Sequence, residues 1–156
     1  MVQFMRTNCK DVYATGDIAS FPMGGGGGDG LDSALVNVGH WQMALHHGRT
    51  AALAILGRPT AIDRTAVPFF WSSMFGKSVR FCGWPAHSVD DVVVHGDVDQ
   101  LHFAAFYCAP DGRVSAVATM NFDPLAIQFA ALLREGGVLT KQDVVDDAKS
   151  WLSKLS

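Results

Sequence analysis

Three short segments of the chain carry side chains that could bind a cofactor. In the first, Gly16-Asp17 follows residues 11–15, which have the residue types of a short strand. A carboxylate at the end of a strand stands where ligands bind in open α/β sheets, and it accepts hydrogen bonds from sugar-type hydroxyls. A turn aspartate that caps the next segment is the simpler interpretation, because aspartate is common in turns. The spacing leaves both interpretations open.

The second and third segments are aromatic. His40 and Trp41 stand at the start of a predicted helix, where free N–H groups favour an electron-rich ligand atom and the rings could stack on a flat ligand. In the predicted strand 67–72, Phe69 and Trp71 share a face, and Trp71 could wall an aromatic cofactor. For both tryptophans the alternative is burial in the core for packing alone.

Other chemistry has little support. His40 and His47 share a helix face, with His46 beside them, but the helix has no HExxH spacing and no nearby carboxylate or thiol ligand. We therefore predict no metal site and expect solvated or hydrogen-bonded histidines. No Ser/His/Asp order stands out, and a single glutamate leaves little for paired-carboxylate chemistry. No catalytic side chain is predicted.

The three cysteines, Cys9, Cys82 and Cys108, are far apart and form no CxxC, which argues against a disulfide scaffold, a thiol redox pair or a zinc ribbon. A reducing compartment fits best. The first ten residues have no apolar h-region, so we expect no signal peptide.

Composition indicates a folded chain. Of the 156 residues, 49% are hydrophobic and 17% charged, which excludes disorder as the main state. The formal net charge of -3 gives no support to nucleic-acid binding. No apolar run approaches the roughly 18 residues that a membrane helix needs.

The elements that would position the first two segments lie in residues 1–66. We interpret residues 23–33, which include five consecutive glycines, as a flexible surface loop. It is not expected to be a phosphate loop, since it has no GxxxxGK[ST] spacing and no strand is predicted to lead into it. A helix is predicted over 40–56 and ends at Gly57. Its apolar stripe comprises Trp41, Ala44, Leu45, Gly48, Ala52 and Ile55.

Residues 67–156 have the pattern of an α+β unit. Five strands rich in valine and aromatic residues are predicted at 67–72, 77–82, 89–95, 101–108 and 113–121. Short connections, including the turn Pro110-Asp111-Gly112, favour antiparallel pairing. Two helices follow, over 124–135 and over 140–152 with Thr140 as its N-cap.

In their linked order, these motifs resemble one family. The strings DVYATGDIASFP, VNVGHWQMALHHGRTAALAILG and VPFFWSSMFGKSVRFCGW are similar to the pyridine-nucleotide-dependent flavoprotein reductases, above all the apoptosis-inducing factor 3-like branch related to ferredoxin and rubredoxin reductases. DDVVVHGD, LHFAAFYC, VSAVATMNFDP and the terminal SWL match as well. The resemblance covers nearly the whole chain apart from the polyglycine loop.

The resemblance implies a domain organisation. Full family members have an FAD-binding domain, an inserted NAD(P)H domain and a C-terminal α+β domain, and this branch adds a Rieske-type iron–sulfur domain. Residues 1–66 then correspond to the C-terminal remnant of the FAD-binding domain. Residues 67–156 correspond to the reductase C-terminal, dimerisation-type domain, an antiparallel five-stranded sheet with C-terminal helices. We therefore expect a fragment or truncated product that lacks the part of the FAD-binding domain that holds the ADP half of FAD, lacks the NAD(P)H domain, and is inactive alone.

By resemblance, Asp17 contacts the ribityl and phosphate part of FAD, His40 and Trp41 mark the helix start that meets the flavin, and Trp71 lies at its nicotinamide-facing side. NAD(P)H would be the co-substrate. Expected partners are the missing FAD and NAD(P)H domains, an iron–sulfur electron acceptor and a second copy in a homodimer. The expected location is intracellular, either cytoplasmic or mitochondrial. The alternative is a non-enzymatic α+β interaction module, which would carry no flavin colour.

Overall fold

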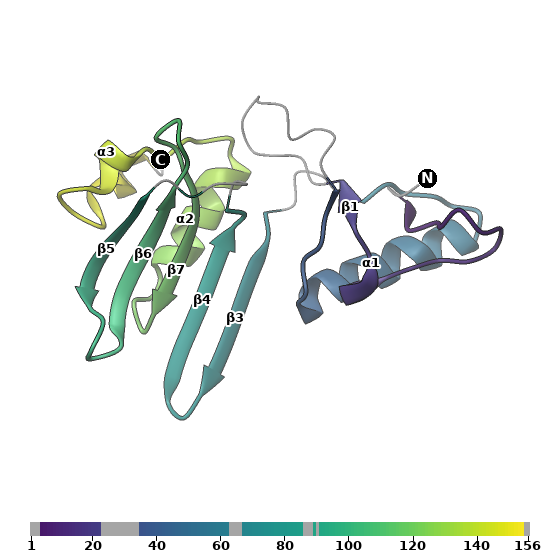
Figure 1. The fold of residues 1–156 in the computed structure, drawn as a ribbon, viewed down its shortest axis with the longest axis horizontal. Helices are drawn as coiled ribbons and strands as arrows, with labels where there is room; N and C mark the ends of the chain where they lie inside the picture. The colour runs from purple at the N-terminus through teal and green to yellow at the C-terminus, as the bar shows by residue number, and fades with distance from the viewer. Residues whose placement is uncertain (1–3, 23–34, 63–66, 86–88, 90, 155–156) are drawn as a thin grey trace. The chain divides into compact units, whose positions relative to one another are not determined.

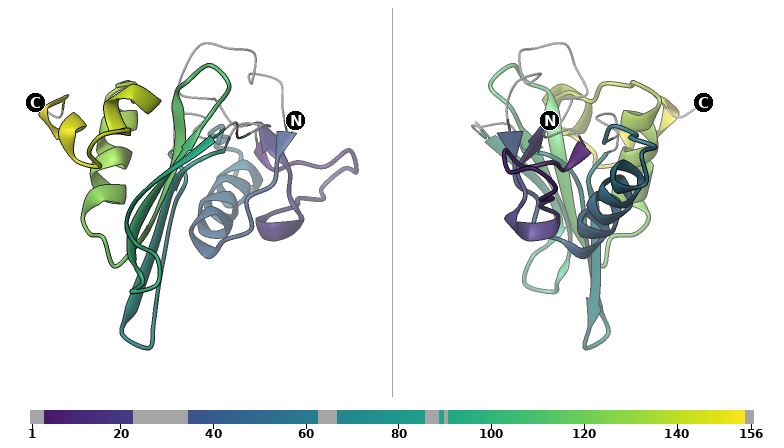
Figure 2. Two further views of the ribbon diagram at one scale, coloured as in Figure 1. Left: turned by 60° about the vertical axis from the view of Figure 1, so that its left-hand side comes forward. Right: turned by 90° about the vertical axis from the view of Figure 1, so that its right-hand side faces the viewer.

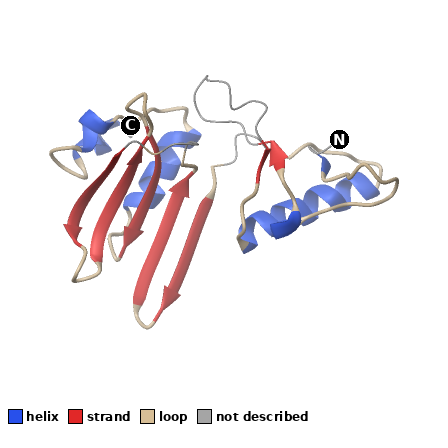
Figure 3. Ribbon diagram, in the orientation of Figure 1, coloured by secondary structure: helices blue, strands red, loops and turns tan. Residues whose placement is uncertain are grey.

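The computed structural model describes residues 4–22, 35–62, 67–85, 89 and 91–154. The chain divides into two compact units, Met1–Ala66 and Val67–Ser156, which are described separately here. The first is built around one long helix, and the second around a sheet with helices (Figures 1 and 3).

The second unit contains a five-stranded antiparallel sheet in the order β3-β4-β7-β6-β5. Its strands are β3 (Phe69–Met74), β4 (Lys77–Gly83), β5 (Asp91–Asp97), β6 (His102–Cys108) and β7 (Val114–Met120). All five predicted strands are therefore confirmed, with ends shifted by one or two residues. The expected turn between the last two strands is also confirmed, and the Gly112 amide donates to the Ala109 carbonyl at 2.8 Å.

The core of the second unit lies on one face of this sheet. Helix α2 (Leu125–Arg134) runs across that face, which confirms the helix predicted over 124–135 (Figure 2). Because side chains alternate along a strand, every second residue of β6 and β7 points toward α2. The buried cluster that results includes Cys82, Ala104, Phe106, Cys108, Val117, Leu125, Ala126, Phe129 and Leu132. Each large side chain buried there contributes about 1.5–3 kcal/mol.

The single helix predicted over 140–152 was wrong. Thr140 does begin a helix, and its amide donates to the Asp143 carboxylate at 2.8 Å, but α3 ends at Val144. The Asp143 and Val144 carbonyls, which would accept the next hydrogen bonds of a continuing α-helix, are bonded to side chains instead. Ser150 Oγ donates to Asp143 O, and His95 Nε2 bonds Val144 O, both at 2.5 Å. Such side-chain bonds compete with the helical ladder. A 3-10 segment, η4 (Ser150–Lys154), follows instead.

The first unit is organised by α1 (Trp41–Ile55), which confirms the helix predicted over 40–56. Gly57, with φ of +71°, follows its end. The predicted apolar stripe is not the side of the helix that packs: Trp41, Leu45 and Ile55 are exposed by 51%, 66% and 64%. The helix carries apolar residues on more than one side, and the side that is buried comprises Met43, His47, Thr50, Ala51 and Ala54.

Two other expectations for the first unit need correction. Residues 11–15 form no strand; within the described residues Tyr13 makes an isolated antiparallel bridge with Arg6 instead. A two-residue strand, β1 (Phe21–Pro22), does lead toward the glycine tract and pairs with β2 (Leu35–Val36). The predicted loop 23–33 itself lies outside the described residues.

Candidate functional site

Asp17 lies in a tight turn that glycine makes possible. Gly16 has φ of +72°, a conformation that other residues rarely adopt, and it opens the 3-10 turn η2 (Gly16–Ile18). The Ala19 amide closes the turn by donating to Gly16 O at 3.0 Å. The Asp17 side chain is exposed and makes no hydrogen bond in the described part of the chain, so it is available to a ligand.

The backbone of this turn is held by a side chain that sequence reasoning missed. Asn37 Nδ2 donates to the carbonyl oxygens of Asp17, at 2.6 Å, and of Ala19, at 3.1 Å. Asn37 stands three residues before the helix start, so this contact ties the turn to the segment that enters α1. An asparagine beside a predicted helix N-terminus is a common pattern, and nothing in its spacing identifies this partner.

The start of α1 lies against Asp17. A Cβ placed on Gly39 would be 3.8 Å from the Asp17 carboxyl carbon. His40 is the N-cap, and its Nδ1 accepts from the Met43 amide at 3.4 Å. Burial lowers the pKa of His40, and the negative charge of Asp17 partly opposes that shift. His40 is therefore neutral at pH 7, which leaves a lone pair for the helix amide.

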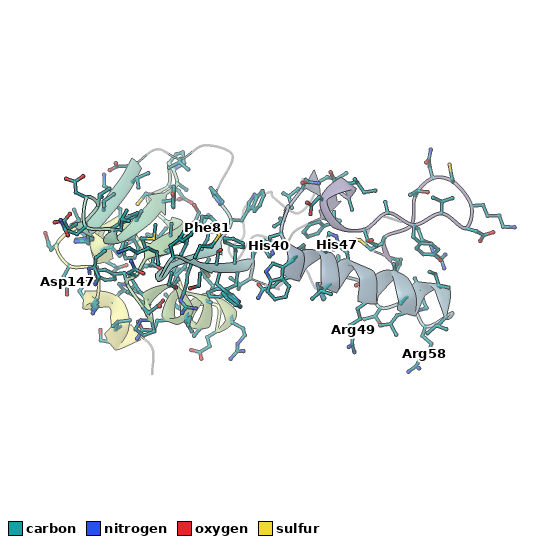
Figure 4. The ribbon with its side chains drawn as sticks, turned by 90° about the horizontal axis from the view of Figure 1, so that it is seen from below. His40, His47, Arg49, Arg58, Phe81 and Asp147 are labelled. Atoms are coloured by element: carbon teal, nitrogen blue, oxygen red, sulfur yellow. The ribbon has the colours of Figure 1, made fainter. Side chains whose placement is uncertain are left out.

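A second histidine holds the turn from the helix side. His47 is fully buried, and its Nδ1 accepts from the Gly16 amide at 3.2 Å. Figure 4 shows His40 and His47 along the side of α1 that faces the turn, whereas Arg49 and Arg58 extend to the other side. Burial lowers the pKa of His47, and the neighbouring charge of His46 lowers it further. The expectation of a hydrogen-bonded histidine is thus confirmed for His47.

The two candidate tryptophans are exposed. Trp41 is 51% and Trp71 is 45% accessible, so packing of the core alone does not explain either ring. Trp71 belongs to the second unit, where it is the direct cross-strand partner of Arg80. Asp17, His40 and Trp41 all belong to the first unit. Whether Trp71 contributes to the same site stays a prediction.

The two buried cysteines offer little reactivity. Cys82 and Cys108 are buried in the second unit, and burial raises the pKa of both thiols, that of Cys82 to about 12. A thiol is nucleophilic as its thiolate, so these two are inert at neutral pH. Within the described residues no three histidine, cysteine or carboxylate side chains come together as metal ligands.

The residues around Asp17 fit part of FAD. An exposed carboxylate accepts hydrogen bonds from the hydroxyls of a ribityl chain, and a helix N-terminus favours an electron-rich atom. The described residues of this unit therefore suit the hydroxyl-bearing part of a flavin nucleotide.

Comparison with known proteins identifies the second unit. The Reductase C-terminal family model matches residues 69–155. Apoptosis-inducing factor 3 of Mus musculus and of Homo sapiens are each 39% identical over 142 residues, covering 91% of this chain and 22% of the relative. The probable ferredoxin reductase CtmF of Castellaniella defragrans is 32% identical over 144 residues, covering 90% of this chain and 32% of its own length.

Solved structures show the same fold. A ferredoxin reductase from Rhodopseudomonas palustris superposes with a TM-score of 0.75 at 23% identity, covering 98% of this chain and 35% of that one. Putidaredoxin reductase in a covalent complex with putidaredoxin gives a TM-score of 0.74 at 24% identity, covering 98% and 34%.

The five-stranded antiparallel sheet with its C-terminal helices has the fold of a ferredoxin reductase C-terminal domain. The chain belongs to the Reductase C-terminal family. It spans only about a fifth to a third of the length of these curated relatives. No helix in the described ranges is long and apolar enough to cross a membrane.

Proposed function

We propose that this chain is the C-terminal part of an FAD-dependent oxidoreductase that passes electrons from NAD(P)H through the flavin to an acceptor. The observation that carries this proposal is the 39% identity to apoptosis-inducing factor 3 over 91% of the chain. A ferredoxin–NAD(+) reductase component from Paraburkholderia xenovorans, 30% identical over 115 residues, supports a nicotinamide co-substrate and an iron–sulfur acceptor. We propose a cytoplasmic or mitochondrial location for this enzyme.

In this proposal the bound flavin supplies the redox chemistry, taking a hydride and releasing electrons. Asp17 accepts hydrogen bonds from cofactor hydroxyls, and the helix start at His40 orients an electron-rich atom of the ligand. The exposed ring of Trp41 offers a flat surface to an aromatic cofactor, and the exposed ring of Trp71 is proposed, within its own unit, as a second cofactor-binding side chain. No catalytic acid or base is assigned to the chain.

The exposed face of α1 supports a larger parent protein. Trp41, Leu45 and Ile55 recur at helical spacing, and each is at least half exposed. An apolar helix face of this kind is typical of a surface that another part of a protein covers. We propose that the FAD and NAD(P)H domains cover it in the complete enzyme.

The chain alone should neither hold FAD tightly nor oxidise NAD(P)H. One carboxylate and one helix start contribute about 1–3 kcal/mol each as charge-assisted or dipolar hydrogen bonds. Association costs several kcal/mol of entropy. Micromolar affinity needs about 8 kcal/mol net, so the binding is expected to be weaker than that.

The test compares this chain alone with the same chain fused after the preceding domains of apoptosis-inducing factor 3. Both are loaded with FAD and passed through gel filtration, and the retained flavin absorbance is measured. We expect flavin on the fusion and none on the chain alone. Stoichiometric flavin on the chain alone would contradict the assignment of the binding segments, and a fusion without flavin would contradict the oxidoreductase.

A second candidate is an interaction or dimerisation module. It is favoured by Val92 and Val94 on the outermost strand β5, which are 40% and 47% exposed on the sheet face away from α2. Sedimentation of the chain alone distinguishes it: a stable dimer that carries no flavin, together with a fusion that carries none, would favour this module over the oxidoreductase.

A further inference from the structure

His47 is a buried titratable group that the proposed function does not use. Its exposed fraction is 0%, and it lies two turns of α1 beyond the N-cap His40. The edge of its ring meets Phe21, with centroids 4.7 Å apart and planes at 75°. These contacts fix the ring in one orientation, because its rotation would displace a buried aromatic side chain.

One ring nitrogen of His47 reaches the turn that carries Asp17. Nδ1 accepts from the Gly16 amide, 31 residues earlier in the sequence, at 3.2 Å. A nitrogen that accepts a hydrogen bond carries no proton, so the ring is the neutral Nε2–H tautomer. The pKa of His47, which burial lowers, agrees with this assignment.

The other ring nitrogen of His47 makes the burial of this side chain costly. Nε2 is buried and has no hydrogen-bond partner within the described residues. A buried unpaired polar group costs free energy, and such exceptions in native structures need an explanation. The hydrogen bond at Nδ1 supplies one, because a hydrocarbon side chain at this position would leave the Gly16 amide without an acceptor.

We infer that His47 is a positioning residue for Asp17. Its Nδ1 fixes the amide of Gly16, Asn37 fixes the carbonyls of Asp17 and Ala19, and the Asp17 carboxylate is thereby held beside Gly39 at the start of α1. This inference rests on the proposed role of Asp17 in binding the hydroxyl-bearing part of FAD. His47 itself touches no ligand in this account; it acts through the turn.

The contact is tested first on the chain alone, without flavin. In a ¹⁵N-labelled sample, we expect a scalar coupling across the Gly16 N–H···Nδ1 bond and imidazole ¹⁵N shifts of the Nε2–H tautomer. His47→Leu should speed hydrogen exchange at Gly16 about tenfold, as expected for the loss of one hydrogen bond. His46→Leu is the matched control on the same helix and should leave the Gly16 exchange rate unchanged.

The consequence is tested in the fusion with the preceding reductase domains. We expect His47→Leu to weaken FAD about tenfold, and His47→Gln, whose amide oxygen is an acceptor, to restore most of that affinity. Full affinity in His47→Leu, in a fusion that Asp17→Ala does weaken, would overturn the inference and leave the proposed function intact. If Asp17→Ala also binds FAD fully, the role proposed for Asp17 fails instead. An unchanged Gly16 exchange rate in His47→Leu would overturn the inference regardless of flavin.

Discussion

In the second unit, side chains from three strands and α2 form one buried apolar cluster. The strands beneath this cluster are hydrogen-bonded to one another in one antiparallel sheet. In the first unit, the turn that carries Asp17 is fixed by two hydrogen bonds that Asn37 donates to its carbonyls and by one that the Gly16 amide donates to His47. Removing a side chain from the dispersed core lowers stability without displacing one particular functional group, whereas removing either side chain that holds the turn changes the position of Asp17. The first unit should therefore be the part of the chain in which small changes alter function.

The largest effect is expected in the core of the second unit. Phe129 of α2 is fully buried and meets Trp151 edge-on, so Phe129→Ala removes a ring and leaves a cavity. We expect a loss of about 3–5 kcal/mol in the free energy of unfolding, measured in urea. Ile127→Ala, on the exposed side of the same helix, is the control and should cost less than about 1 kcal/mol. Equal losses would contradict the position of this core.

Alanine substitutions at Gly83 and Gly76 distinguish the stability cost of steric crowding from that of backbone strain. Gly83 and Gly76 both have positive φ, of 93° and 70°, but a Cβ on Gly83 would overlap the Ser115 carbonyl oxygen, whereas Gly76 faces open space. We expect Gly76→Ala to cost about 1 kcal/mol, the ordinary penalty of a left-handed residue. Gly83→Ala should cost about 2–3 kcal/mol, because overpacking adds to that penalty. Thermal unfolding of both variants tests this, and similar values would contradict the close approach of β4 and β7.

The two units should differ in their response to pH. The pKa values of His40 and His47 lie below 6.5, so between those values and 6.5 the unfolded chain binds more protons, and stability falls as pH falls from 7. In the second unit, Lys141 and the Val92 amide lower the pKa of Asp91 below 3.8; the stability this provides is lost only as pH falls through that lower value. The protection factors against amide exchange in α1 should therefore fall between pH 7 and 5 before those in β5 do. The reverse order would contradict the burial of these histidines.

The smallest effect is a gain. Phe75 is 97% exposed and has φ of +52° at the β3–β4 turn, followed by Gly76, also at positive φ. Two central residues at positive φ favour asparagine followed by glycine. Phe75→Asn should stabilise the chain by about 0.5–1 kcal/mol, because little burial is lost. A destabilised variant in urea unfolding would show that the Phe75 ring makes contacts in solution.

The sheet of the second unit was predictable because each strand alternates and each connection is short. The early end of the C-terminal helix was not predictable, because the hydrogen bonds that end α3 come from His95 and Ser150. His95 is distant in the sequence, and Ser150 lies beyond the residue where α3 ends. In α1 the helix was predictable but its buried side was not, since apolar residues occur on more than one face and tertiary packing selects among them.

For the candidate site, sequence reasoning selected residues but not their connections. Asp17 and His40 were chosen by type and position, and the structure brings them together through Gly39. Asn37 and His47 were missed as positioning residues because their partners are backbone groups, which leave no pattern in the sequence. For His47 the sequence offers only its spacing, seven residues after the N-cap His40 and on the same face of the helix.

The most direct test of the account is the FAD affinity of the fusion with and without the Asp17 carboxylate. Asp99→Ala, which removes an exposed carboxylate of the second unit, is the control. A charge-assisted hydrogen bond of about 1.5–3 kcal/mol corresponds to roughly 10- to 150-fold in affinity. We expect Asp17→Ala to weaken FAD within that range and Asp99→Ala to leave it unchanged. Equal affinity of the two variants and the parent fusion would contradict a flavin site at the Asp17 turn.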